Sequence, residues 1–364
     1  MTRGQLPALL KLAGILVFLY LFIVGIGAMG HSFKLFGSEF SERILNTTAS
    51  PLVGLFIGIL ATSLVQSSST TTSIVVGMVA GGAISISGAI PIIMGANIGT
   101  TITNTIVSMG HITRKAEFRR AFAAAVIHDF FNITAVAVLF PLELATGFLS
   151  RSASYLAALF EGIGGLKLGS PLKAATTPTI TFLAELVDQQ PVLLLIIAVL
   201  LIFATLIGIV KILRSLVIMR VSAFFDEHLF KTAARAFFFG VLLTALVQSS
   251  SITTSLAVPL VGAGLLSLRQ IFPYTLGANV GTTVTAMLAA LSTANAAAIT
   301  VSFAHLLFNI SGILLIWPIK KVRRLPILMA EFAAAMAIKN RFLPLLFILL
   351  VFFIIPLILI VTTR

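Results

Sequence analysis

Residues 66–73 read QSSSTTTS, and residues 248–255, which begin 182 positions later, read QSSSITTS. The two stretches are identical at seven of eight positions, and each interrupts otherwise apolar sequence. A run of hydroxyl groups and an amide within a hydrophobic segment is costly unless these groups contact a polar cargo, water or ions. The duplicated stretch therefore indicates both an internally repeated fold and a functional site.

The composition is that of a polytopic membrane protein. Of the 364 residues, 59% are hydrophobic and 10% are charged, and the mean hydropathy is +1.13, which is far too apolar for a soluble globular protein. Several stretches have about the length that a bilayer-spanning helix needs: Leu6–Gly30, Ile90–Met109, Phe118–Leu144, Val192–Val210, Ala294–Trp317 and Phe342–Val361. We therefore expect an all-α bundle.

The net charge of +13 does not indicate a nucleic-acid partner, because the basic residues lie between apolar spans. Their positions instead indicate how the chain is oriented in the membrane. Basic residues outnumber acidic ones in segments 111–120, 211–235 and 320–341, whereas segments 31–50 and 148–190 are balanced. By the positive-inside tendency, the three basic segments and the N-terminus are cytoplasmic and the two balanced segments lie outside. The expected location is the plasma (inner) membrane, crossed several times.

A second motif repeats with the same spacing. GANIGTT at 95–101 recurs as GANVGTT at 277–283, and HDFFN at 128–132 aligns with HLLFN at 305–309. An outside segment precedes the first copy and an inside segment precedes the second, so we expect the copies to enter the membrane from opposite faces. Such inverted-topology repeats bind substrate at their interface near the bilayer midplane, and alternating access follows from the symmetry.

The apolar segments before the two polar runs are too short to cross a bilayer, and glycines follow soon after each run. This pattern predicts two re-entrant helical hairpins with QSSS at their tips. The chain then divides into a first inverted repeat at 1–147 with its hairpin at about 51–82, an external linker at 148–190, a second repeat at 191–319 with its hairpin at about 236–265, and residues 320–364. The linker is expected to be a loop with at most a short surface helix.

Residues 320–364 lie outside the repeat. We expect a basic cytoplasmic loop followed by a C-terminal transmembrane helix. The run KKVRR at 320–324 is interpreted as an orientation anchor, with binding to anionic membrane lipid as a secondary possibility.

The hairpin tips are predicted to bind an anion. A tip at mid-membrane exposes backbone N–H groups at the start of the returning half-helix, where the helix dipole also favours negative charge. Two facing tips would surround a tetrahedral oxyanion such as phosphate with amides and hydroxyls. The expected ligands are Ser67, Ser68, Ser69, Ser249, Ser250 and Ser251. Since neither motif contains Lys or Arg, co-bound cations would neutralise the anion, and sodium is the natural candidate.

Neutral oxygen atoms near the tips are candidate ligands for such a hard cation. They come from the amides of Gln66 and Gln248, the hydroxyls of Thr100, Thr101, Thr282 and Thr283, and freed carbonyls near Asn97 and Asn279. The alternative is that these Ser and Thr hydroxyls merely bond to their own helix backbone. Duplication in inverted register favours the functional interpretation.

Asp129 lies well inside a predicted span. A buried carboxylate there is costly unless it is paired, protonated or bound to a cation, and we favour a cation ligand over a structural bond to His128 or a helix neighbour. His128 and His305 are expected to be hydrogen-bonded packing residues. Asn132 and Asn309, at matched positions, either coordinate a cation or hold helices together.

These residues resemble the type II sodium–phosphate cotransporter family. The paired QSSS and GxNxGT motifs carry the resemblance, together with IPIIMG at 90–95, FRRAF at 118–122 and HD at 128–129. It covers most of 51–145 and 236–315. It implies sodium-driven phosphate symport, with phosphate between the two serine triplets. Sodium is implied near Gln248, Ser249, Thr282 and Thr285.

The resemblance also implies electrogenic transport, because electrogenic members carry the residues found here as Ala123, Ala125 and Asp129. His111 and Arg114 stand where animal members place Gln and Asp in a proposed additional sodium site, so the resemblance does not carry that site over. The chain lacks the extracellular cysteines of animal relatives and the C-terminal regulatory domain of many bacterial ones. It is therefore identified as a minimal bacterial form.

Three other functions remain open at this point: sodium-coupled transport of another oxyanion or a small carboxylate, net phosphate export, and an ion channel whose pore the tips line. An enzyme is not expected, because the sequence has no cysteine, no GxSxG elbow and no HExxH motif. No organic cofactor is expected, and the sequence leaves the oligomeric state open.

Overall fold

The protein is an all-α polytopic membrane protein, as predicted. The computed structural model describes residues 5–37, 39, 42, 44–45, 50–221 and 229–363, and this part contains no β-strand. Six helical spans within it are apolar and long enough to cross a membrane: Leu10–Phe36, Ile86–Met109, Lys115–Thr146, Pro191–Ile212, Ala296–Ile316 and Leu343–Thr362. Residues 46–49 and 222–228, used above to assign the sides of the membrane, lie outside the described residues.

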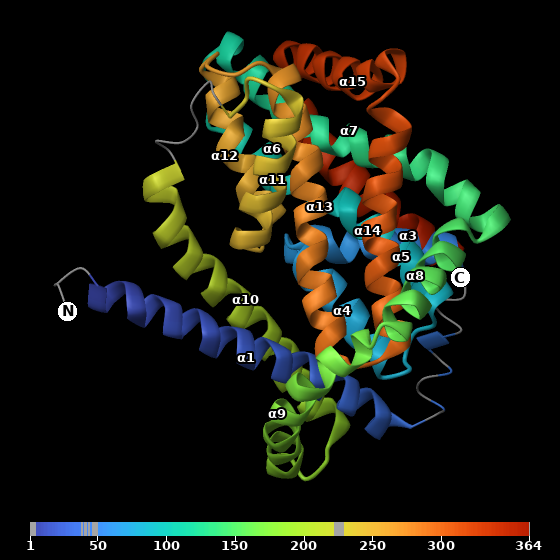
Figure 1. Ribbon diagram of the computed structural model, residues 1–364. Helices are drawn as coiled ribbons and strands as arrows, with labels where there is room; N and C mark the ends of the chain where they lie inside the picture. Colours follow the sequence, from blue (N-terminus) through green and yellow to red (C-terminus); the bar gives the residue numbers. More distant parts are fainter. Residues whose placement is uncertain are drawn as a thin grey trace.

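The helices follow one another along the chain (Figure 1). Their bounds are α1 Gln5–Phe36, α3 Pro51–Val65, α4 Ser68–Ala80, α5 Ile86–Gly99, α6 Ile102–Met109, α7 Lys115–Thr146, α8 Phe148–Gly162, α9 Gly165–Leu186, α10 Pro191–Val221, α11 Ala233–Val247, α12 Ser250–Gly262, α13 Leu268–Thr293, α14 Ala296–Ile316, α15 Lys320–Lys339, α16 Leu343–Ile348, the π-helical η1 Leu349–Ile354 and α17 Ile355–Thr362.

Two pairs of short apolar helices, α3–α4 and α11–α12, contain the polar tips. Each of α3 and α11 has 15 residues, a length of about 22 Å, which falls short of the ~30 Å hydrocarbon core. Gln66 and Gln248 end these helices in the left-handed conformation, with φ of 55° and 57°. After one extended residue the chain begins α4 or α12, which packs beside the preceding arm.

Glycine allows the first arm of each pair to touch the helix that follows the second arm. α3 packs on α5, and α11 packs on α13. A Cβ atom on Gly95 would lie 1.9 Å from the carbonyl oxygen of Leu55, and one on Gly277 would lie 2.0 Å from that of Phe237. The first glycine of each GANxGTT motif is therefore required for close helix packing.

Each half of the chain makes equivalent contacts with the other half. α4 packs on α13 and α14 of the other half, while α12 packs on α6 and α7. In the same way α8 packs on α14, and α15 packs on α7. Figure 1 shows α4 in the lower part of the molecule and α12 in the upper part. The second arms thus lead away from the centre in opposite directions.

Three segments differ from expectation. The stretch 148–190 is mostly helical, as α8 and α9, because Gly147 and Gly164 take left-handed conformations between helices and do not mark an open loop. Glu143 accepts the backbone N–H of Leu149 and so caps α8. The basic stretch after α14 is also a helix, α15. The span expected at Ile90–Met109 consists of two helices, α5 and α6, with a break at Thr100 and Thr101.

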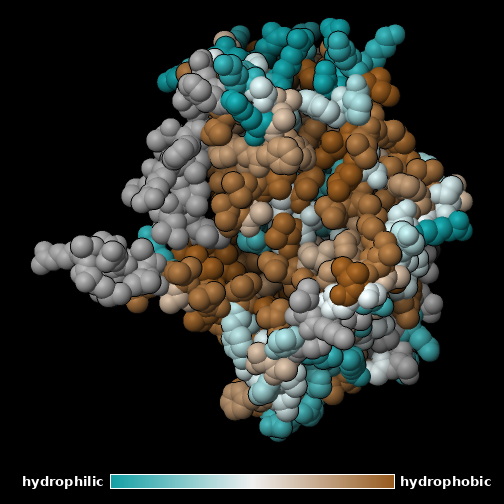
Figure 2. All heavy atoms as spheres, in the orientation of Figure 1, coloured by the Kyte–Doolittle hydropathy of each residue, from teal (hydrophilic) through white to brown (hydrophobic). Residues whose placement is uncertain are grey.

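An apolar belt crosses the middle of the face shown in Figure 2. Figure 2 shows hydrophobic residues between a hydrophilic top and a hydrophilic bottom. α15 crosses the top and α9 lies at the bottom (Figure 1). The helices α3, α4, α11 and α12, which contain the tips, lie between these two ends (Figure 1), at the level of the apolar belt.

Candidate functional site

Both QSSS tips begin a helix in the same way. Ser67 is the N-cap of α4, and its Oγ accepts the backbone N–H of Thr70 at 3.2 Å. Ser249 is the N-cap of α12, and its Oγ accepts the backbone N–H of Ile252 at 3.4 Å. The first N–H groups of a helix have no partner within it. The backbone N–H groups of the next two serines of each tip therefore have no acceptor within their helix and lie at the positive end of its dipole, the arrangement that favours an anion.

The two tips meet. Ser69 Oγ donates to the carbonyl oxygen of Gln248 at 3.2 Å, so α4 begins beside the turn between α11 and α12. Ser251 Oγ donates to the carbonyl oxygen of Thr100 at 3.0 Å, so α12 begins beside the break between α5 and α6. Two motifs that are 182 residues apart in the sequence thus form one cluster at the centre of the bundle.

The two glutamines of the tips have different surroundings. Gln248 donates through Nε2 to the carbonyl oxygen of Ala245, and its Oε1 accepts the hydroxyl of Thr285 at 2.5 Å. The side chain of Gln66 is exposed. The structure therefore brings Gln248 and Thr285 together, as the family resemblance implies, and leaves Gln66 at the edge of the cluster.

The threonines of the second motif donate their hydroxyl hydrogens to their own helices. The acceptors lie three or four residues earlier for Thr100, Thr101, Thr282 and Thr283. This is the backbone bonding that was one alternative for these residues. Because a hydroxyl oxygen also has lone pairs, the same geometry leaves each oxygen able to accept from, or coordinate, a ligand.

A chain of side-chain hydrogen bonds joins three helices behind the tips. Asn132 Nδ2 on α7 donates to the carbonyl oxygen of Asn97 on α5 at 2.7 Å. Asn279 Nδ2 on α13 donates to Asn132 Oδ1 at 2.7 Å, and His128 Nε2 lies 2.5 Å from Asn279 Oδ1. Since an amide oxygen only accepts, His128 is the donor. Asn132 therefore links helices, and the second lone pair of its Oδ1 remains open to a ligand. His128 is the hydrogen-bonded packing residue that was expected.

Asp129 is completely buried, and neither carboxylate oxygen has a hydrogen-bond partner among the described residues. It lies three residues before Asn132 and so shares a face of α7 with it. The structural alternative, a bond from Asp129 to His128, does not occur. An unpartnered carboxylate at this depth is the group expected to attract a cation.

Sequence reasoning missed two threonines. Thr62 and Thr244 are fully buried, and their hydroxyl oxygens have no partner among the described residues. A Cβ atom on Gly99 would lie 2.8 Å from Thr62 Cβ, and one on Gly281 would lie 2.7 Å from Thr244 Cβ, so both threonines contact the second motif. The sequence did contain a sign of these two threonines, because the repeat extends upstream of each tip as TxLVQSSS with the same spacing of 182 residues.

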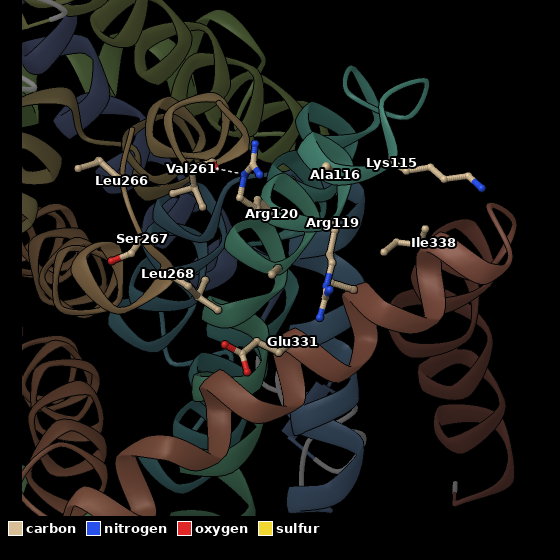
Figure 3. Close-up of a pocket in the computed structure, with 12 residues that line it drawn as sticks. Lys115, Ala116, Arg119, Arg120, Val261, Leu266, Ser267, Leu268, Glu331 and Ile338 are labelled. Atoms are coloured by element: carbon tan, nitrogen blue, oxygen red, sulfur yellow. Dashed lines mark hydrogen bonds between the residues drawn. The ribbon is translucent and has the colours of Figure 1, made fainter. Parts of the chain in front are cut away.

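Each second arm ends at a cavity with basic side chains. Arg120 donates through Nε and Nη2 to the carbonyl oxygen of Gly262 at 2.9 and 2.7 Å, at the end of α12. A cavity of about 630 Å³ lies there, and Arg119 and Glu331 also line it (Figure 3). At the end of α4, Asn295 donates to Ala80 at 3.5 Å beside a second cavity of about 280 Å³. Lys34 and Lys173 line the second cavity.

His111 and Arg114 form a group apart from the tips. His111 Nδ1 lies 3.2 Å from a carboxylate oxygen of Glu117, and Arg114 donates to Glu117 at 3.0 Å. These residues are already paired with a carboxylate and present no sodium-binding oxygen of their own. The geometry is that of a local ion pair at the start of α7.

The comparisons with known proteins decide the family. The sequence matches the family model described as "Na+/Pi-cotransporter" over residues 21–170 and 200–338, which include both copies of each motif. The chain belongs to the Na+/Pi-cotransporter family. This cotransporter-family chain is 37% identical to "Sodium-dependent phosphate transport protein 2A" of Ovis aries, over 96% of this chain and 67% of that one. It is 32% identical to "Sodium-dependent phosphate transport protein 2B" of Homo sapiens, over 98% of this chain and 66% of that one.

The chain therefore spans about two thirds of the length of these relatives. No solved structure matches this member of the Na+/Pi-cotransporter family.

Proposed function

We propose that this protein is a secondary active transporter that couples sodium to inorganic phosphate by symport. The observation that carries the proposal is that the two QSSS tips meet through the bond from Ser69 to Gln248, while Ser251 of the second tip bonds to Thr100 at the break between α5 and α6. The facing helix starts make an anion site, and the sodium-dependent phosphate transport proteins among its relatives indicate the cargo.

Phosphate binds between the tips in this proposal. Its oxygens accept the free backbone N–H groups at the starts of α4 and α12, and the serine hydroxyls complete the shell. The ligands are drawn from Ser67, Ser68, Ser69, Ser249, Ser250 and Ser251. Since neither tip contains Lys or Arg, the negative charge is neutralised by helix dipoles and by sodium.

Sodium binds on both sides of the phosphate. One set of ligands surrounds the Gln248–Thr285 pair and includes Ser249, Thr282 and Thr283. The other centres on Asp129 and draws on Asn97, Thr100, Thr101 and Asn132, with Gln66 and Asn279 as outer members. All of these supply oxygen atoms, which hard cations prefer.

Transport is electrogenic in this proposal, because Asp129 adds one fixed negative charge that favours binding of a further cation. The hairpins provide alternating access. Two features support this: the two halves exchange equivalent contacts, and a cavity with basic side chains lies at the outer end of each second arm.

Phosphate uptake into proteoliposomes tests the proposal. Radiolabelled phosphate uptake is compared under an inward sodium gradient and an inward potassium gradient, first at zero voltage and then with the inside negative. We expect uptake to require sodium and to rise with inside-negative voltage. Sodium-independent uptake, or flux that shows no saturation by phosphate, would refute sodium symport in favour of another coupling ion or a channel.

A further inference from the structure

A basic cavity lies where four helices meet, away from the tips. It has a volume of about 410 Å³ and is lined by residues from the starts of α11 and α15, from α13 and from the segment after α14. Four of the lining residues are cations: Arg269, Lys320, Arg323 and Arg324. Among the residues that the structure describes, none that lines this cavity is acidic. Four cations around one cavity repel each other unless an anion lies between them.

The walls of the cavity are apolar. Phe272, Trp317 and Ile327 line it together with the four cations. The guanidinium carbon of Arg323 lies 4.6 Å from the centre of the Trp317 ring, a cation–π contact that fixes the arginine at the cavity wall. The cavity therefore presents both cations that suit a phosphate and apolar surface that suits a hydrocarbon.

The cavity lies at the boundary of the membrane. Trp317 directly follows the span Ala296–Ile316, and Trp is typical of the membrane–water interface. α15 crosses the hydrophilic top of the molecule above the apolar belt (Figures 1 and 2). Its exposed apolar side chains recur at helical spacing: Leu325, Leu328, Phe332 and Met336. This pattern is that of an amphipathic helix lying in the interface.

We propose that this cavity binds the headgroup of an anionic phospholipid from the leaflet on the α15 side. The phosphate contacts Arg269, Lys320, Arg323 and Arg324, and the glycerol and upper acyl chains contact the apolar wall. A free phosphate ion would contact only the cations of the cavity, whereas a lipid would contact both the cations and the apolar wall. The bound lipid would join α11 and α13, which support the second tip, to α15.

Trp317 makes binding directly observable, because it is the only tryptophan in the chain. The experiment measures quenching of its fluorescence in purified protein held in neutral phosphatidylcholine. Phosphatidylglycerol with brominated acyl chains is titrated in, and the same titration is repeated with brominated phosphatidylcholine. We expect the anionic lipid to quench at a mole fraction at least tenfold lower. Equal quenching by both lipids would overturn the proposal.

Variants that remove positive charges test whether the lipid binds in this cavity. Since each cation near an anionic surface changes binding by about fivefold, Arg269→Gln combined with Arg324→Gln should weaken quenching roughly 30-fold. Lys115→Gln combined with Lys339→Gln removes the same charge from the same side of the protein outside this cavity, and we expect it to bind as the wild type does. Equal loss in both double variants would overturn a specific site.

Competition with inorganic phosphate distinguishes a phospholipid headgroup from a free phosphate ion as the ligand of the cavity. If it displaces brominated phosphatidylglycerol at millimolar concentration, the cavity binds a free anion and the lipid proposal is wrong. We expect no displacement. The wild-type titration and this competition decide the proposal even if the arginine variants fail to fold, and neither depends on transport activity.

Discussion

At the scale of single residues, polar atoms without partners indicate where ions would bind. Most hydroxyls in the two motifs donate to their own helix, and hydrogen bonds join His128 Nε2, Asn279, Asn132 and the carbonyl oxygen of Asn97. The carboxylate of Asp129 and the hydroxyls of Thr62 and Thr244 have no hydrogen-bond partner among the described residues. Leaving such groups unpartnered in a membrane protein is costly, so a bound cation is the simplest source of compensation.

Asp129→Asn should remove voltage dependence while preserving the shape of the site. One elementary charge crossing 100 mV contributes ~2.3 kcal/mol, so the steady-state phosphate accumulation at −100 mV should fall roughly 50-fold relative to wild type. Accumulation at zero voltage should change less. Radiolabelled uptake into voltage-clamped proteoliposomes measures both. An unchanged response to voltage would contradict the role of Asp129 as a cation ligand.

Thr62→Val and Thr244→Val should separate binding from folding. Removing a buried hydroxyl that lacks a partner relieves a cost of ~1–3 kcal/mol, so the melting temperature without sodium should stay constant or rise. The increase in melting temperature on adding sodium should shrink. Thr134→Val is the matched control, since the Thr134 hydroxyl is satisfied by the carbonyl of Phe130. A sodium response that remains intact in both variants would assign these threonines to packing alone.

At the scale of helices, the GANxGTT motif determines packing as well as containing proposed sodium ligands. Gly95 and Gly277 lie where any side chain would collide with the backbone of the opposing arm, and the following Asn97 and Asn279 take part in the bonds between helices. A motif that the sequence presents as a candidate ligand set thus also determines how closely each hairpin packs on its neighbour.

Gly95→Ala should therefore destabilise the protein. The added methyl group would lie 1.9 Å from the Leu55 carbonyl oxygen, and overpacking of this kind costs about 1–3 kcal/mol. Gly162→Ala is the control, because a Cβ atom there meets nothing within 4 Å. Thermal unfolding followed by circular dichroism compares the two. Equal melting temperatures would mean that α3 and α5 can separate without cost.

Arg120 should control how firmly the second hairpin is held against α7. Arg120→Gln loses the paired hydrogen bonds to Gly262, so α12 should move more freely. Because the chain has no cysteine, Leu266→Cys, which lies buried in the wall of the adjacent cavity, reports that motion without background. Its labelling by a maleimide should accelerate several-fold with Arg120→Gln. A rate equal to that with Arg120 intact would show that the hydrogen bonds do not restrain the hairpin.

At the scale of the whole molecule, sequence patterns predicted the transmembrane spans and the polar tips. They did not predict the features that arise from contacts between distant segments. Hydropathy and length identified the six spans, and the polar runs located the tips. The helices in 148–190 were missed because the glycines at 162, 164 and 165 and the prolines at 171 and 178 are typical of loops, whereas Pro171 and Pro178 lie inside α9 and Gly164 lies between two helices. The bonds from Asn132 to α5 and α13, and the unpartnered hydroxyls of Thr62 and Thr244, arise only when distant segments pack.

The last prediction concerns the proposed inverted arrangement of the two halves. α4 ends beside the cavity that Lys173 of α9 lines, whereas α12 ends beside the cavity that Glu331 of α15 lines. If the halves are inverted, α9 and α15 lie on opposite faces of the membrane. In the cysteine-free chain, Glu185→Cys on α9 should react with an impermeant maleimide from outside intact cells. Lys339→Cys at the end of α15 should react only after permeabilisation, as the excess of basic residues in that segment also predicts. Reaction of both from the same side would exclude the inverted arrangement, and with it the symmetry on which alternating access by the two tips depends.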